Sequence, residues 1–213
     1  MDSKVRRSQE REMLRDKILD AARELFVEEG VEAASMRKIA KKIGYSATAL
    51  YDYFEDKESL LRELCDADFV RFNQSLAKTA GAIADPVERL RALGRAYFAF
   101  ARQYPSHYRL MFLTPQPVRD PSESGIERGN PDQDAYAYLR STVAEALATG
   151  RFREEFRDAD LVAQVIWSGA HGLVALHMVK ACDHWFNWHP FDETAEALID
   201  VTLRGMLRQE EAR

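Results

Sequence analysis

The chain has 213 residues, of which 46% are hydrophobic and 31% charged, an ordinary composition for a soluble protein of one large or two small domains. We find no apolar run long enough to cross a bilayer, and the charged start MDSKVRRSQEREMLRDK is no signal peptide, so we expect a cytoplasmic protein that does not associate with membranes. The only cysteines are Cys65 and Cys182, which exclude a disulfide framework and fit a reducing compartment.

The net charge of −5 is unevenly distributed along the chain. Residues 1–62 contain 13 basic and 13 acidic residues, whereas residues 63–213 contain 17 and 22. The acidity therefore lies in the C-terminal part. An acidic protein can still bind nucleic acid, because binding needs only a local basic surface.

Helical spacing of apolar residues occurs nearly everywhere, and we find neither a convincing strand pattern nor an internal repeat. The first expected helix ends at Gly30. Its apolar face consists of Leu14, Ile18, Ala22, Leu25 and Phe26. Ser35 and Ser46 are expected to cap two short helices on either side of a turn at Gly44. A small three-helix core would contain Ile39, Ala40, Ile43, Leu50 and Phe54.

Further helices are expected along the remainder of the chain. A fourth helix should begin at Asp56 and run to about Leu76. The sequence Asp85-Pro86-Val87-Glu88 predicts the start of a helix that ends near Tyr104, followed by a short helix over 105–112. Residues 114–131 are rich in Pro, Gly and charge, which predicts a mobile loop.

The last three helices should carry most of the apolar surface of the C-terminal part. They are expected over 131–149, ending at Gly150, from Asp158 or Asp160 to about Lys180, and from Asp192 onward. The helix ending near Lys180 is apolar over much of its circumference. The expected buried side of the last helix comprises Ala195, Leu198, Ile199, Val201, Thr202 and Met206.

The segment SMRKIAKKIGYSATALYDYFEDKESL (35–60) is the most informative part of the chain. The stretch from Ala33 to Tyr51 has four basic residues and no acidic one. Two short helices with a tight turn and a positive surface suit the major groove of DNA. The small side chains of Ala47, Thr48 and Ala49 would let the second of these helices enter the groove deeply, where Thr48 can contact a base edge or a thymine methyl.

These residues closely resemble the DNA-binding signature of TetR-type transcriptional repressors. The resemblance covers about the first quarter of the chain. It implies an all-α fold with a three-helix helix-turn-helix domain at 1–62 and a helical ligand-binding and dimerisation domain at 63–213. Residues 97–112 together with Trp167, His171 and Gly172 resemble a subgroup whose C-terminal domain carries a Trp-His-Gly signature.

The resemblance implies that Ser35, Arg37, Tyr51 and Lys57 contact phosphates, which position the protein without selecting a sequence. The full set of expected DNA-binding residues is Ser35, Arg37, Tyr45, Ser46, Ala47, Thr48, Tyr51, Tyr53 and Lys57. Tyr53 could equally be a packing residue, and Lys38, Lys41 and Lys42 could be a solvated helix surface. Asp52 departs from the neutral or basic residue often found there, so we expect it to face away from DNA.

Aromatic residues are abundant in the C-terminal part and suit an apolar effector cavity, although each could also be ordinary core. The expected effector-binding residues are Phe98, Tyr104, Tyr108, Met111, Phe112, Trp167, His171 and Met178. His171 is the best polar candidate for a ligand contact, and a satisfied core histidine is at least as good a reading. The segment Cys182–His189 matches no strong zinc pattern, so we expect neither a metal nor a cofactor.

The two C-terminal helices are too apolar for a monomer surface and predict a two-fold homodimer through a four-helix bundle. A dimer would contact successive major grooves of a near-palindromic operator. The expected function is a regulator, by preference a repressor, that a small apolar effector releases from DNA. No phosphate loop, nucleophile elbow or His-Glu-x-x-His motif indicates an enzyme. A helical interaction module and a transcriptional activator remain the alternatives.

Overall fold

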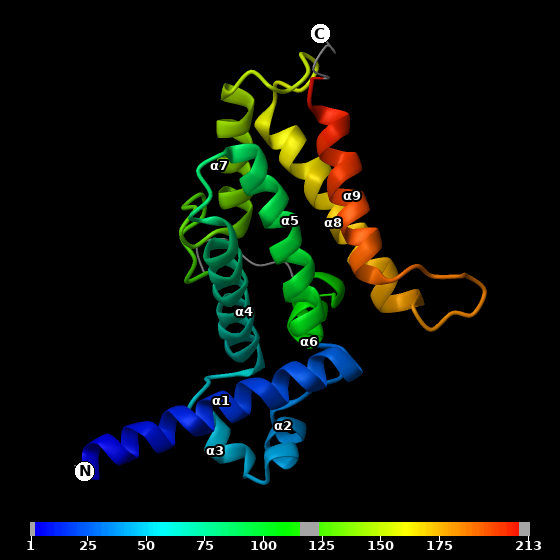
Figure 1. Ribbon diagram of the computed structural model, residues 1–213. Coiled ribbons are helices and arrows are strands. Elements are labelled where there is room, and N and C mark those ends of the chain that lie inside the picture. Colours follow the sequence, from blue (N-terminus) through cyan, green and yellow to red (C-terminus); the bar gives the residue numbers. More distant parts are fainter. Residues whose placement is uncertain (1–2, 116–123, 209–213) are drawn as a thin grey trace. The chain divides into compact units, whose positions relative to one another are not determined.

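The structure, a computed structural model, describes residues 3–115 and 124–208. Every regular secondary-structure element in these ranges is a helix (Figure 1). The only extended pairing there is an isolated bridge between Phe152 and Leu207. The all-α fold class is therefore confirmed. Residues 116–123 of the loop expected over 114–131 lie outside the described residues.

The chain folds into two compact units. The first comprises Met1–Phe69 and Tyr104–Gly125, and the second comprises Val70–Gln103 and Ile126–Arg213. These units do not coincide with the domains expected at 1–62 and 63–213, because the segment after Gln103 packs with the N-terminal helices. The domain boundary itself remains a prediction, since compactness does not show which segments fold independently.

The first unit is built on a long helix, α1 (Ser3–Glu29). The short helix α2 (Met36–Ile43) packs against α1, and α3 (Ala47–Tyr51) packs against α2. The first part of α4 (Lys57–Ala80), the short α6 (Pro105–Tyr108) and a π-helical turn, η1 (Arg109–Leu113), complete it. Its core contains fully buried side chains from five of these elements: Ile18, Phe26, Ile39, Leu50, Leu64 and Leu110. The small core expected around α2 and α3 is present, with Ile43 only partly buried.

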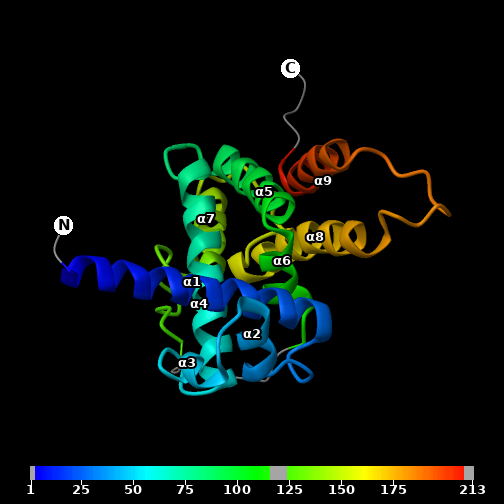
Figure 2. The same ribbon diagram turned by 90° about the horizontal axis from the view of Figure 1, so that it is seen from below.

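The second unit is a bundle of α5 (Pro86–Gln103), α7 (Ala135–Ala148), α8 (Ala159–Lys180) and α9 (Phe191–Met206) with the end of α4. Figure 2 shows α5, α8 and α9 as neighbouring elements. Gly94 allows α5 and α9 to approach closely, because a Cβ there would lie 2.9 Å from Cγ1 of Ile199. Three ion pairs join the same two helices: Arg91–Asp200, Arg95–Glu196 and Arg102–Asp192.

Helix starts follow the expected caps in most cases. Asp85 accepts hydrogen bonds from the amides of Val87 and Glu88 at 2.8 and 3.0 Å, and Asp158 caps α8. The expected start of α7 at residue 131 is wrong, because Asp134 caps the helix and it begins at Ala135. The expected start at Asp192 is also wrong, since α9 begins at Phe191 after Pro190.

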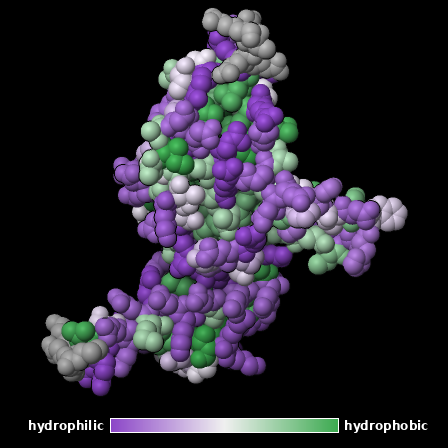
Figure 3. All heavy atoms as spheres, in the orientation of Figure 1, coloured by the Kyte–Doolittle hydropathy of each residue, from purple (hydrophilic) through white to green (hydrophobic). Residues whose placement is uncertain are grey.

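One side of α8 is apolar and uncovered within this chain. Six of its exposed positions repeat at intervals of three and four residues and form one stripe (the α8 stripe): Leu161, Val165, Ser168, Gly172, Leu176 and Val179. Val179, at the end of the α8 stripe, is 72% exposed. On α9, Val201 is 70% exposed, so the expectation that Val201 lies on the buried side of the last helix is wrong. Figure 3 shows hydrophobic residues reaching the surface of this unit among polar ones.

The composition of α8 also corrects an expectation. The helix is long and apolar enough to cross a bilayer, by length and composition alone. The expectation that no apolar run has this length is therefore wrong. Only 17% of the residues in its most apolar stretch are fully buried within this chain, and several of its large apolar side chains are exposed.

Candidate nucleic-acid interface

The turn between α2 and α3 is fixed by local hydrogen bonds. Gly44 has φ 78° and ψ 27°, a left-handed conformation that glycine adopts without strain. The amide of Tyr45 donates to the carbonyl of Ala40 at 2.9 Å. The hydroxyl of Ser46 accepts from the amide of Ala49 at 3.2 Å, which begins α3 immediately after the turn. The direction of α3 relative to α2 is therefore set by backbone geometry.

The helix α3 has one anchored side and one exposed side. Leu50 is fully buried, and Ala47 packs partly against the core of the unit. Thr48 is exposed, and Tyr45 and Tyr51 are 45% and 54% exposed. Tyr45, Ser46, Thr48 and Tyr51 thus form an uncharged, hydrogen-bonding surface on the turn and the short helix.

The basic residues of α2 fall into two classes. Lys38 pairs with Glu29 of α1 at 2.6 Å, and Lys42 pairs with Glu24 of the same helix at 2.9 Å. The hydrogen bond from Lys42 to Glu24 raises the pKa of this lysine. These two lysines therefore hold α2 on α1, and their charge is largely neutralised there.

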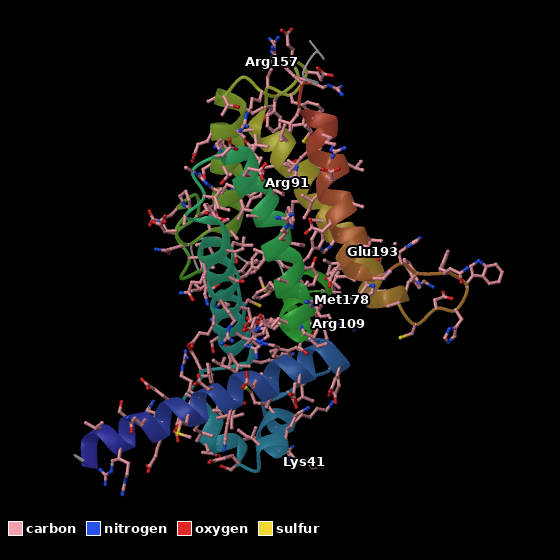
Figure 4. All side chains as sticks on the ribbon, viewed as in Figure 1. Lys41, Arg91, Arg109, Arg157, Met178 and Glu193 are labelled. Atoms are coloured by element: carbon pink, nitrogen blue, oxygen red, sulfur yellow. The ribbon has the colours of Figure 1, made fainter. Side chains whose placement is uncertain are left out.

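Arg37 and Lys41 lie on a different face of α2, one turn apart. Both are exposed, and neither forms an ion pair within the ranges that the structure describes. Figure 4 shows Lys41 on the side of α2 away from α1. Lys41 is absent from the expected contact set, and the sequence gives a signal for it only through its four-residue spacing from Arg37.

Lys57 occupies the first turn of α4, and its ammonium group already has two acceptors. Its Nζ donates to the carbonyl of Val31 at 2.8 Å and to that of Ala34 at 3.4 Å. One N–H remains for a phosphate. The side chain therefore closes the α1–α2 loop in addition to any contact with DNA. The hydroxyl of Ser35 accepts from the amide of Lys38, so its proton is also still available for donation.

The residues after α3 lie against α1. Asp52 is exposed, and its carbonyl accepts from Arg11 Nη2 at 3.1 Å. The Arg11 guanidinium carbon lies 5.1 Å from the ring centroid of Tyr53, which is only partly exposed. Tyr53 thus has a packing role, and its contact with DNA remains a prediction.

A buried ion pair joins the helices of the first unit. The carboxylate of Asp68, on α4, is 1% exposed and accepts from Arg23 Nε at 3.0 Å and Nη2 at 2.8 Å. His107 Nδ1, on α6, donates to the same carboxylate at 2.8 Å. Burial alone would raise the pKa of Asp68, but the hydrogen bonds from His107 and Arg23 hold it below its ordinary value. These three residues, the Asp68 cluster, were not among the sequence candidates.

The expected effector residues are divided between the two units. Tyr104, Tyr108, Met111 and Phe112 belong to the first, where Tyr108 is fully buried and its ring lies 4.9 Å from that of Phe112. Their burial is equally that of core residues, so their role in ligand binding remains a prediction.

The other four effector candidates belong to the second unit. Phe98 is buried and lines an apolar hollow between α5, α8 and α9, whereas Trp167 is 37% exposed and Met178 is partly buried. His171 Nδ1 lies 3.4 Å from the hydroxyl of Tyr97, and its ring centroid is 6.4 Å from that of Trp167. Burial lowers the pKa of His171, which favours a neutral ring that can accept the Tyr97 proton.

The helices α2 and α3 form a helix-turn-helix on a buried core. Its exposed helix α3 is uncharged, and Arg37 and Lys41 of α2 lie beside it without an ion pair among the described residues. This arrangement is typical of DNA-binding regulators of the helix-turn-helix class. Comparison with known families agrees. The description "Bacterial regulatory proteins, tetR family" matches residues 18–64, and "Tetracyclin repressor-like, C-terminal domain" matches residues 90–202. The chain belongs to the tetR family of bacterial regulatory proteins.

Relatives with assigned roles are similar over most of the chain. The transcriptional repressor NicS of Pseudomonas putida is 29% identical, over 95% of this chain and 96% of its own length. The repressor KstR2 of Mycobacterium tuberculosis is 30% identical over 71% and 75%. The transcriptional activator FasR of Mycolicibacterium smegmatis is 28% identical over 83% and 74%. These relatives include both repressors and an activator.

Solved structures show the same fold. A TetR family transcription regulator from Marinobacter aquaeolei has a TM-score of 0.76 at 21% identity, covering 95% of this chain and all of its own. The regulatory protein SCO4313 has a TM-score of 0.69 at 26% identity, covering 92% and 98%. The helical arrangement is therefore shared across the family despite low sequence identity.

Proposed function

We propose that this chain is a ligand-responsive transcriptional repressor that binds a near-palindromic operator as a homodimer. The observation that carries the proposal is the exposed surface formed by the turn and α3, where Tyr45, Thr48 and Tyr51 are exposed while Leu50 is fully buried. In this proposal Thr48 and Ala47 contact base edges, and Ser35, Arg37, Tyr51 and Lys57 contact phosphates. Lys41 joins Arg37 on the unpaired basic face of α2.

The homodimer is supported by the α8 stripe. Its exposed residues repeat at intervals of four, three, four, four and three, which is the spacing that pairs two helices along a common seam. Ser168 and Gly172 stand in its middle, and small residues there allow close approach of a partner helix. Two copies of α8 and α9 would then form a four-helix bundle that covers the apolar surface.

The effector is proposed to be small and largely apolar, and a cytoplasmic location follows from a role on DNA. The support for an apolar effector is the aromatic content around Phe98, Tyr97 and Trp167, with His171 as the polar contact. We also place the chain in the Trp-His-Gly subgroup, on the spacing of Trp167, His171 and Gly172.

Activation is the second candidate function, favoured by the similarity to FasR. A reporter gene under the chain's own operator distinguishes the two: deletion of the regulator raises expression for a repressor and lowers it for an activator. A helical interaction module without DNA binding is tested by mobility shift with the DNA flanking the gene. Binding only at very low salt, without sequence preference, would favour that alternative and contradict the proposal.

A further inference from the structure

The N-terminal third of α1 lacks a buried face. Every described side chain from Val5 to Met13 is exposed, whereas Ile18, Ala22 and Phe26 further along the same helix are fully buried. Figures 1 and 2 both show this part of α1 extending past α3. A helical segment without an apolar contact gains nothing from burial, so its position beside α3 raises the question of what it contacts.

The core-facing stripe of α1 changes from apolar to basic toward its start. Counting back from Ile18 by helical spacing, the same face carries Leu14, then Arg11 and Arg7. Glu10 and Glu12 adjoin Arg11 in sequence and therefore point about 100° to either side of it. The face thus has no acidic residue over this length. We call Arg7 and Arg11 the basic stripe.

The direction of the basic stripe is fixed at Arg11. Its guanidinium donates to the carbonyl of Asp52 at 3.1 Å and covers the ring of Tyr53 at 5.1 Å, so this face is turned toward the end of α3. Arg15, one turn further, lies over the ring of Phe54 and is paired with Glu63. Arg7, one turn earlier, is exposed and forms no ion pair in the described part of the chain.

We propose that the basic stripe contacts the DNA backbone just outside the segment that α3 contacts. The inference rests on the proposed function and adds a second surface to it. Arg7 lies about 6 Å along the helix axis from Arg11, at a rise of about 1.5 Å per residue. At about 3.4 Å per base pair along one strand, this length reaches phosphates roughly two base pairs farther out.

The contact adds affinity without sequence information. Arginine and lysine bind phosphates as cations, and each phosphate contact contributes about 0.9 to the slope of log K against log salt. Arg6 provides a matched control in the same helix. Helical spacing puts it on a different side from the basic stripe, and it pairs with Glu10 at 3.5 Å.

The test measures binding of the full-length chain to a duplex containing its operator, by fluorescence anisotropy over a salt series. Arg7→Ala should lower the slope by about 0.9 per protomer and weaken binding to operator and random duplex by the same factor. Arg7→Lys should restore the wild-type slope. Arg6→Ala removes the same charge and should leave the slope unchanged. Alanine is the best helix former, so neither variant should unfold α1.

Hydroxyl-radical footprinting gives a second readout, with protection by the wild type extending about two base pairs beyond that of Arg7→Ala at each end. Equal slopes for wild type, Arg7→Ala and Arg6→Ala would overturn the basic stripe while leaving the repressor intact. Equal decreases of the slope for Arg7→Ala and Arg6→Ala would mean that only net charge matters, and would also overturn the contact proposed for the basic stripe. A wild type that binds operator and random DNA alike would contradict the proposed function itself.

Discussion

Replacement of Asp68 by asparagine should remove much of the stability of the first unit. The carboxylate is 1% exposed, the Arg23 side chain is 8% exposed, and the two form paired hydrogen bonds at 2.8 and 3.0 Å. Asparagine keeps the shape of the side chain but removes its charge. The buried guanidinium of Arg23 is then left with the carboxylate of Asp20 as its remaining ion-pair partner among the described residues. Removing one partner of a buried ion pair costs about 3–5 kcal/mol, so we expect a loss in this range.

The assay is urea unfolding of the full-length chain followed by circular dichroism at one fixed protein concentration, because the stability of the proposed dimer depends on concentration. Asp192→Asn is the matched control. It breaks the Arg102–Asp192 pair, whose side chains are 65% and 72% exposed, and should cost less than about 1 kcal/mol. The double variant Arg23→Met/Asp68→Leu should lose less than Asp68→Asn, since it leaves no unpaired guanidinium.

The pH dependence gives an independent check on the Asp68 cluster. The pKa of Asp68 is lowered in the folded protein, so its contribution is fully present above the ordinary aspartate pKa of about 3.9. It is lost as the pH falls through the lower folded-state pKa. The difference in unfolding free energy between wild type and Asp68→Asn should therefore shrink on acidification through that window. A loss no larger than that of Asp192→Asn, or a pH-independent difference, would refute the reasoning.

Three further substitutions separate the proposed roles. Thr48→Ala should relax specificity at one base position at a cost of about 1–3 kcal/mol there, and equal losses on operator and random DNA would remove Thr48 from the base-contacting surface. Lys57→Ala should weaken binding to all sequences and lower the salt slope by roughly 1. A variant that loses stability but keeps the wild-type slope would mean that Lys57 only holds the carbonyls of the α1–α2 loop and does not contact DNA. Gly172→Leu should abolish the homodimer without unfolding the chain, because no atom lies within 4 Å of a Cβ built there, and a variant that still sediments as a dimer would move the interface off the α8 stripe.

The helix-turn-helix could be predicted from the sequence because its signals are local. Ser35 and Ser46 cap helices through hydrogen bonds that span three residues, and Gly44 alone supplies the left-handed turn. The spacing of Leu50 and Phe54 reports burial directly. Such short-range rules do not depend on the rest of the fold, which is why the second and third helices occur at the predicted positions.

The contacts that join distant segments could not be predicted in the same way. Asp68 is separated from Arg23 by 45 residues and from His107 by 39, and no spacing rule links them. The pairing of Lys38 and Lys42 with α1 likewise depends on how two helices cross. In the sequence the four basic residues of α2 are not distinguishable from one another. In the structure, Arg37 and Lys41 are the ones that form no ion pair with a carboxylate of the described residues.

The apolar helices show a different limit. Val201 has the spacing of a buried residue yet is 70% exposed, and four large apolar side chains of the α8 stripe are exposed as well. Periodicity identifies a face that must be covered, and it does not say whether the same chain covers it. The proposed homodimer accounts for both observations with one interface.

The most direct measurement is a mobility-shift titration of the full-length chain with the DNA that flanks its own gene, at physiological salt and with excess random duplex. A single shifted complex that holds two protomers, resists the competitor and weakens steeply with added salt is the expected result. A chain that stays monomeric on its DNA, or that random duplex displaces as readily as operator, would contradict the account.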